Sequence, residues 1–127
     1  MTDWSNIVAT HLESLIAGET FIRGSEKPEG VGIPRRCTFV GQYGGRQPQS
    51  MFSTTEQIHE ILIQCLVRGS SRDEQATQTL ATQIYDALRN AAPTGVMVIR
   101  PQAPPIRLGL EGDSYRFSIN VIVVARE

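Results

Sequence analysis

The hydrophobic spacing of the chain changes between residues 57 and 88, and this change constrains the fold more than any other feature. From Gln57 to Arg68 the pattern is close to alternation, which is typical of a β-strand with two different faces. One face predicts a core and carries His59, Ile61, Ile63, Cys65 and Val67. The other mixes apolar with polar side chains and carries Ile58, Glu60, Leu62, Gln64, Leu66 and Arg68. The sequence therefore predicts a long strand that runs directly into a helix.

Two helices are predicted from apolar residues that recur at intervals of three and four. The helix after the long strand begins with a capping box of Ser71 and Glu74. Its apolar face holds Ala76, Leu80, Ala81, Ile84, Ala87 and Leu88. An earlier helix extends from about Asp3 to Ala17, and its apolar stripe holds Trp4, Ile7, Val8, Leu12, Leu15 and Ile16. Asp3 is a suitable N-cap for it, and Gly18 suits the left-handed residue that ends it.

The chain ends in a second long alternating stretch, which begins at Ser114. One of its faces holds Tyr115, Phe117, Ile119, Val121, Val123 and Ala125, and the other holds Arg116, Ser118, Asn120, Ile122 and Val124. At about 3.3 Å per residue this strand reaches ~40 Å, about twice the usual strand length. Before it, "VMVIRP" predicts a short strand, and Pro104 with Pro105 excludes a central strand from the segment between the two.

The remaining segments are shorter strands and loops. A strand of modest length is predicted around Phe39, and Gly44 with Gly45 is expected to end it. The stretch from Arg46 to Thr55 has no apolar period and predicts an extended loop. Together the elements predict a single α+β domain over residues 1–127, with long strands in an antiparallel sheet packed by two helices on one face.

No recognisable catalytic, cofactor or metal site is present in the sequence. His59 and Glu60 would open a zinc-protease motif, but Ile63 stands where the second histidine is required. The "GVG" stretch lacks the third glycine of a dinucleotide loop, and there is no Gly-x-Ser-x-Gly elbow. Cys37 and Cys65 lack metal-ligand spacing and lie in strand-like stretches, where a reduced cysteine behaves as a small buried hydrophobe. We therefore expect a protein that is not an enzyme and needs no cofactor.

Charge and hydropathy narrow the possible partners. The formal net charge of -1 argues against a protein that wraps nucleic acid. Arg35, Arg36 and Arg46, with Tyr43 available to stack a base, keep a small nucleic-acid-binding module as an alternative. No stretch is as long and apolar as a membrane span, and the first residues do not form a signal peptide. We expect a soluble protein made in the cytoplasm, without a membrane partner.

Protein interaction remains as the function that the surfaces favour. Two interpretations of the polar strand residues stay open: they face a subunit neighbour or a channel, or they are ordinary solvent-facing residues. The residues concerned are Glu60, Gln64, Arg68, Arg116, Ser118 and Asn120. A second hypothesis gives the segment from Gln42 to Thr55 an ordering transition on assembly, because it is rich in Gly, Pro and Ser. Its assembly loop comprises Tyr43, Gly44, Gly45, Arg46 and Pro48.

The order of the elements and several phrases resemble the tail terminator proteins of long-tailed phages, in the branch often called minor capsid or tail completion proteins. The matching phrases are the N-terminal amphipathic helix, "IPRRCTFVGQYGG", "QIHEILIQCLVRG" followed by "ATQTLATQIYDAL", and "LGLEGDSYRFSINVIVV". Together they cover most of the chain, whereas the stretch from Arg23 to Gly32 departs from the pattern.

The resemblance implies a small α+β subunit that assembles into a homo-hexameric ring. In the virion such a ring sits at the head-proximal end of the tail tube, ends tube polymerisation and joins the tail to the head connector. The implied partners are other copies of the chain, the major tail tube protein and the head-completion or connector protein. The resemblance also implies that DNA passes through the channel without specific recognition. A head-tail connector ring of the stopper or adaptor type is the alternative, because such rings use similarly small domains.

Overall fold

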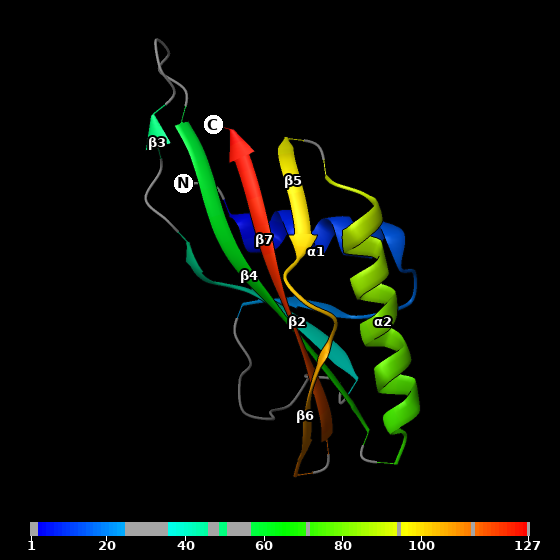
Figure 1. Cartoon of the computed structure of the whole chain (residues 1–127). Helices are drawn as coiled ribbons and strands as arrows, with labels where there is room; N and C mark the ends of the chain where they lie inside the picture. The colour runs from blue at the N-terminus through cyan, green and yellow to red at the C-terminus, as the bar shows by residue number, and fades with distance from the viewer. Residues whose placement is uncertain are drawn as a thin grey trace.

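The described part of the chain folds into a sheet with two helices, as a computed structural model shows (Figure 1). The structure describes residues 3–24, 36–45, 49–50, 57–70, 72–93, 95–112 and 114–126. The helices are α1 (Trp4–Leu15) and α2 (Glu74–Asn90). The strands are β1 (Phe21–Arg23), β2 (Cys37–Gly45), β3 (Gln49–Ser50), β4 (Gln57–Ser70), β5 (Val96–Pro101), β6 (Ile106–Glu111) and β7 (Ser114–Arg126). The predicted α+β class is confirmed.

The two long strands predicted from alternation, β4 and β7, form the centre of the sheet. They pair antiparallel along their whole length, from Ile58 opposite Arg126 to Ser70 opposite Ser114. The sheet order is β1-β2-β4-β7-β5, with β3 also beside β4 and β6 also beside β7. β1 pairs parallel with β2, and the other described pairs are antiparallel. The prediction of long strands in an antiparallel sheet therefore holds, with β1 as the exception.

Strands β5 and β6 share one edge of the sheet, because β7 is long enough to pair with both. β5 lies along the C-terminal half of β7, and β6 lies along its N-terminal half (Figure 1). Pro104 and Pro105 fall in the connection between them, at the point where the chain crosses from one half to the other. β6 begins directly after these prolines and is an edge strand, which agrees with their exclusion of a central strand.

Both helices cover the same face of the sheet, as the hydrophobic pattern predicts. α2 packs on β4, β5 and β7, and α1 packs on β1, β2 and β4. The core between the layers is fully apolar at its centre; its completely buried members include Val8, Leu12, Ile63, Val67, Leu80, Ile84, Ile119, Val121 and Val123. The helices also meet each other where Nε2 of His11 lies 3.1 Å from the main-chain oxygen of Ala91, at the end of α2.

The helix ends agree with the sequence in part. Oδ1 of Asp3 accepts a hydrogen bond from the amide of Asn6 at 3.1 Å, as predicted. Gly18 has a left-handed φ of 83°, but α1 already ends at Leu15, with the extended Ile16 as its C-cap, and so the predicted end at Ala17 was wrong. The cap of α2 is Asp73, whose Oδ1 accepts from the amide of Ala76 at 2.9 Å. The predicted cap, Ser71, was therefore wrong, and Ser71 itself lies outside the described residues.

The turn between β4 and α2 explains this correction. The amide of Asp73 donates to the carbonyl of Ser70 at 3.1 Å, which leaves Asp73 in a non-helical conformation at the helix entry. Its carboxylate also lies next to the positive end of the helix dipole, which favours an anion more than a hydroxyl. The capping-box spacing was met by the sequence, but the turn geometry selected a residue two positions later.

β2 includes the two glycines that were expected to end it, and it ends at the second of them, Gly45. β2 continues to Gly45, and Gly44 and Gly45 pair with Leu62 and Ile61 beyond a bulge at Tyr43. β3 adds two further pairs to β4. A long, regular β4 offers main-chain partners along its whole edge, and this pairing needs no side chain from the glycines. Most of the predicted 46–55 loop, including Arg46 and Pro48, lies outside the described residues.

Candidate functional site

The sheet face that the helices leave uncovered is the candidate site, and we call it the outer face. It carries every second residue of β4 and β7, paired across the strands. The rows, from one end to the other, are Glu60 with Val124, Leu62 with Ile122, Gln64 with Asn120, Leu66 with Ser118, and Arg68 with Arg116. The structure therefore brings all six polar residues selected from the sequence onto one surface.

One half of the outer face is buried within the chain itself. Arg68 and Ser118 are each only 3% exposed, and Leu66 is also buried. The guanidinium carbon of Arg68 lies 5.4 Å from the centre of the Phe39 ring, within reach of a cation–π contact. Phe39, Leu66 and Cys37 form a small second hydrophobic cluster on this side. Arg68 and Ser118 therefore support the surface from inside and are not themselves available to a partner.

The middle row holds two polar side chains, and that of Gln64 is bonded to the neighbouring strand. Nε2 of Gln64 donates a hydrogen bond to Oγ of Ser118 at 3.2 Å. This contact satisfies a hydroxyl in a residue that is otherwise buried, and it fixes the amide of an exposed side chain. Gln64 and the half-buried Asn120 thus form a polar boundary between the buried half of the outer face and the other half.

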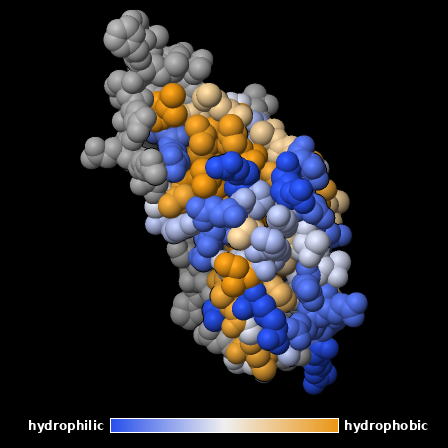
Figure 2. All heavy atoms as spheres, in the orientation of Figure 1, coloured by the Kyte–Doolittle hydropathy of each residue, from blue (hydrophilic) through white to orange (hydrophobic). Residues whose placement is uncertain are grey.

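The other half of the outer face is apolar and accessible. Leu62, Ile122 and Val124 are half-buried, and Val98 of β5, which pairs with Val124, is 45% exposed. Figure 2 shows the molecule in the orientation of Figure 1. Hydrophobic residues gather over the upper ends of β4, β7 and β5, with some hydrophilic residues between them. Exposure of such an apolar cluster to water is unfavourable, and clusters of this kind are typical of protein contact surfaces.

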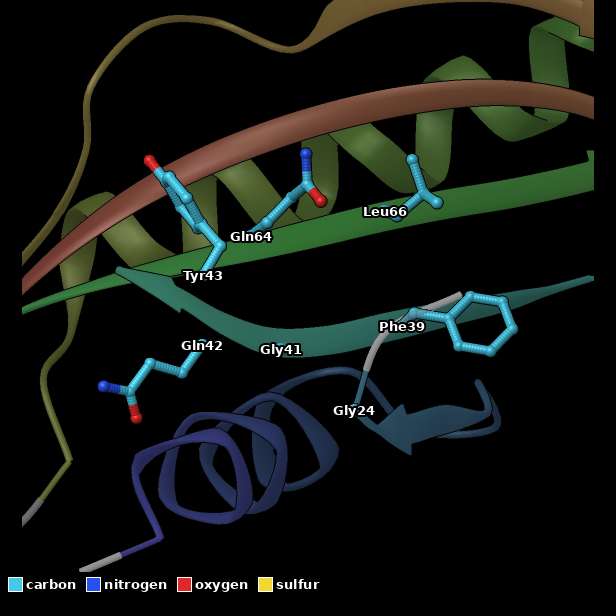
Figure 3. A pocket seen from close by; sticks show the side chains of 7 residues that line it. All are labelled: Gly24, Phe39, Gly41, Gln42, Tyr43, Gln64 and Leu66. Carbon is cyan, nitrogen blue, oxygen red and sulfur yellow. The ribbon is translucent and has the colours of Figure 1, made fainter. Parts of the chain in front are cut away.

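The described part of the assembly loop lies beside this surface, on β2. Tyr43 is 51% exposed, and its ring forms one wall of a small pocket of about 30 Å³ (Figure 3). Gly41 opens the pocket because it carries no side chain between Phe39 and Tyr43. The space is about that of one water molecule, so it excludes a substrate or a cofactor.

Further exposed hydrophobic residues lie along β5 and β6, and the sequence reasoning missed them. Among the described large hydrophobic residues, the most exposed on these strands are Met97, Val98, Ile106, Leu108 and Leu110. The spacing of Ile106, Leu108 and Leu110 was a usable signal, because alternate apolar residues after a proline pair indicate an edge strand. On the helical side of the sheet, Arg107 pairs with Glu74 of α2, and this carboxylate raises the pKa of Arg107.

The described residues hold no metal-ligand cluster, and one of their two cysteines has a suppressed thiolate. Among them, no group of three or more His, Cys, Asp or Glu side chains is placed to hold a metal ion. Burial raises the pKa of the Cys65 thiol to about 12, which suppresses the thiolate that a nucleophile requires. His11 and His59 lie on different elements, and the ring of His59 is 6.3 Å from that of Trp4.

The basic patch considered from the sequence is only partly described. Arg36 is held by Glu19, whose two carboxylate oxygens accept from Nε and Nη2 at 3.0 and 2.8 Å. This pairing raises the pKa of Arg36 and neutralises much of its charge toward a phosphate. Arg35 and Arg46 lie outside the described residues. Of the helices that the structure describes, none is long and apolar enough to cross a membrane.

Comparisons with known proteins place the fold. No family model matches the chain, and no curated protein matches it. Among solved structures, the chain is similar to a chain from the virion of a native gene transfer agent (GTA) particle, with a TM-score of 0.61 and 14% sequence identity. The likeness covers 98% of this chain and 96% of that chain. The two chains therefore share a fold from end to end.

Proposed function

We propose that this chain is a structural protein of a phage-type virion, and that it forms a ring at the head-proximal end of a tail tube. The observation that carries the proposal is the likeness of fold, over almost the whole of both chains, to a chain of a gene transfer agent virion. The resemblance of the sequence to tail terminator proteins points to the same class of particle. In this role the ring ends tube polymerisation and joins the tail to the head connector.

The surfaces of the subunit support an assembly role. An accessible apolar area on the outer face and exposed hydrophobic residues on β5 and β6 are costly in an isolated subunit and are useful in an oligomer. The small pocket beside Tyr43 on the outer face holds about one water molecule. These features favour a protein that acts by binding other proteins or other copies of itself.

The outer-face residues have distinct parts in this proposal. Four polar residues turn toward a neighbouring subunit or the channel. Glu60 lies at the apolar end of the outer face, Gln64 and Asn120 form its middle row, and Arg116 lies at the opposite end. Arg68 and Ser118 hold the surface in place from within. The partners of the ring are other copies of the chain, the tail tube protein and the connector protein, and DNA passes through its channel without base recognition.

Deletion of the gene tests the proposal, with electron microscopy of the resulting particles. The expected result is tail tubes of abnormal length that are separate from filled heads. Supplying the wild-type gene in trans is the control and should restore joined particles of normal tail length.

Two other outcomes have definite meanings. Tails of normal length that fail to join heads would move the protein to the connector side of the junction. Fully normal particles would remove it from the virion scaffold. In that case, retention on a DNA column that falls steeply with salt would favour the nucleic-acid-binding alternative.

A further inference from the structure

Two surfaces on opposite sides of the subunit complement each other. The first, which we call the outer patch, is the apolar half of the outer face with the β5 residues beside it; it comprises Leu62, Val98, Arg100, Ile122 and Val124. Register places Arg100 directly beside Ile122, and Ile122 beside Leu62. Arg100 is exposed, so the outer patch is an apolar surface with an accessible positive charge at its β5 edge.

The second surface, which we call the helical groove, lies between the end of α1 and the middle of α2. Its volume is about 500 Å³, and it is lined by Leu15, Ile16, Ala17, Glu19, Gln83, Asp86 and Ala87. Its lining combines apolar side chains, of which Leu15 is 46% exposed, with a larger share of polar surface. Both charged residues of the lining are acidic. Glu19 already accepts two hydrogen bonds from Arg36, whereas the side chain of Asp86 is 57% exposed and lies 4.0 Å from Arg89.

We propose that the outer patch of one copy packs into the helical groove of the next copy, with Arg100 paired to Asp86. An apolar surface with a base at its edge meets a groove that carries the exposed Leu15 and an accessible acid, so that the charges are complementary and apolar side chains meet. The helices cover one face of the sheet and the outer patch lies on the other, so the contact joins two different surfaces head to tail. Contacts of this heterologous kind continue from copy to copy, and they close into a ring when the rotation between copies is a whole fraction of a turn. The inference rests on the proposed ring and specifies its subunit interface.

Exchanging the two charges tests the contact. Arg100→Glu and Asp86→Arg are each expected to convert the wild-type ring of the full chain into single subunits, because each places like charges in every interface. An equimolar mixture of the two variants should form rings again, in which the variants alternate. In such a ring every interface pairs Arg100 with Asp86 or the new glutamate with the new arginine. Light scattering coupled to gel filtration and native mass spectrometry measure the number of chains.

The matched control is Arg72→Glu, which makes the same change of charge at an exposed position outside both surfaces. It should leave the ring intact. Circular dichroism verifies that each variant is folded, and Arg100→Gln, which removes the charge without reversing it, replaces Arg100→Glu should β5 not tolerate the glutamate. Weakened rings are then expected from Arg100→Gln, with an increased concentration for half-assembly.

The outcomes separate the interface from the function. Rings that persist in both charge variants, or variants that dissociate but do not recombine in the mixture, would overturn the contact while leaving the ring proposal in place. The wild-type chain could also stay a single subunit at every concentration and in the virion. That result would overturn both the proposed ring and the proposed contact. If Arg100→Glu loses the ring and Asp86→Arg keeps it, the contact would instead join two outer patches. The helical groove would then be excluded as the partner surface.

Discussion

Gly69 is the residue at which β4 and α2 come into close contact. A Cβ at this position would lie far inside van der Waals contact with Oγ1 of Thr77, and 3.0 Å from the Cβ of Thr77. Thr77 is buried against the sheet, so the helix would have to move to make room. We expect Gly69→Ala to lower the free energy of unfolding by about 1–3 kcal/mol, the usual cost of overpacking. Urea denaturation measures this change.

Two further variants identify the cause of the Gly69 effect. Gly44→Ala is the matched control, because the new Cβ would lie 3.5 Å from the nearest atom of Leu62, an ordinary contact. It should change stability little. Adding Thr77→Ala to Gly69→Ala removes the clashing hydroxyl and should recover part of the lost stability. Equal losses at Gly69 and Gly44 would show that steric contact with α2 is not the reason.

Cys65 gives the molecule a pH dependence with a defined sign. Burial raises the pKa of its thiol from 9.0 to about 12, so the fold favours the protonated form. This contribution to stability is complete below pH 9 and is lost as the pH rises from 9 toward 12. Between pH 9 and 11 we expect the free energy of unfolding of the wild type to fall more steeply than that of Cys65→Ala, by about 1.4 kcal/mol per pH unit. Parallel curves for the two proteins would contradict this.

At the residue scale, alternation correctly predicted which side chains share a face but not how far each is exposed. Ile61, Ile63 and Val67 are in the core as expected. Arg68 was grouped with accessible polar residues and is buried instead. Its burial involves Phe39, on a strand that is distant in the sequence, so periodicity within one strand carries no information about it.

Among the elements, α2 offers a direct test of its N-terminal cap. Asp73 accepts a hydrogen bond from the amide of Ala76 and lies at the positive end of the helix. We expect Asp73→Ala to lower the free energy of unfolding by about 1 kcal/mol, measured by thermal or urea denaturation. Asp73→Asn keeps an oxygen that can accept the bond and should lose much less. Equal losses in the two variants would assign the effect to charge and would argue against the hydrogen bond.

The elements were predictable where their own side chains decide the structure. Both helices and both long strands were predicted from hydrophobic spacing, and most of the residues on their predicted apolar faces are found in the core. The extension of β2 through Gly44 and Gly45 was not predictable, because it depends on main-chain bonds to β4 and not on the glycines. β6 was missed for a related reason: its partner, β7, comes later in the chain and is long enough to serve two strands.

The whole molecule is organised around the pairing of β4 with β7. β4 is flanked on its other edge by β2 and β3, and β7 by β5 and β6, so both central strands are paired on two sides. The helices cover one face of this centre, and the buried half of the outer face carries the second hydrophobic cluster on the other. The edge strands pair on one side, and β5 and β6 each contain a break in register. The exposed hydrophobic residues of this edge are thus at the less constrained part of the fold.

Hydrogen exchange under native conditions should therefore divide the sheet into two classes. Central amides of β4 and β7 are expected to exchange only when the domain unfolds, so their exchange free energies should equal the free energy of unfolding from denaturation. Amides of β6 bond toward β7 alone, and the register shifts between Arg107 and Gly109, so we expect them to exchange at least about tenfold faster by local opening. Mass spectrometry of peptides from the two regions, with the protein kept as single subunits, makes the comparison. Protection in β6 equal to that in β4 would mean that this edge is already closed within the free subunit, and its exposed hydrophobic residues would then need a different explanation from assembly.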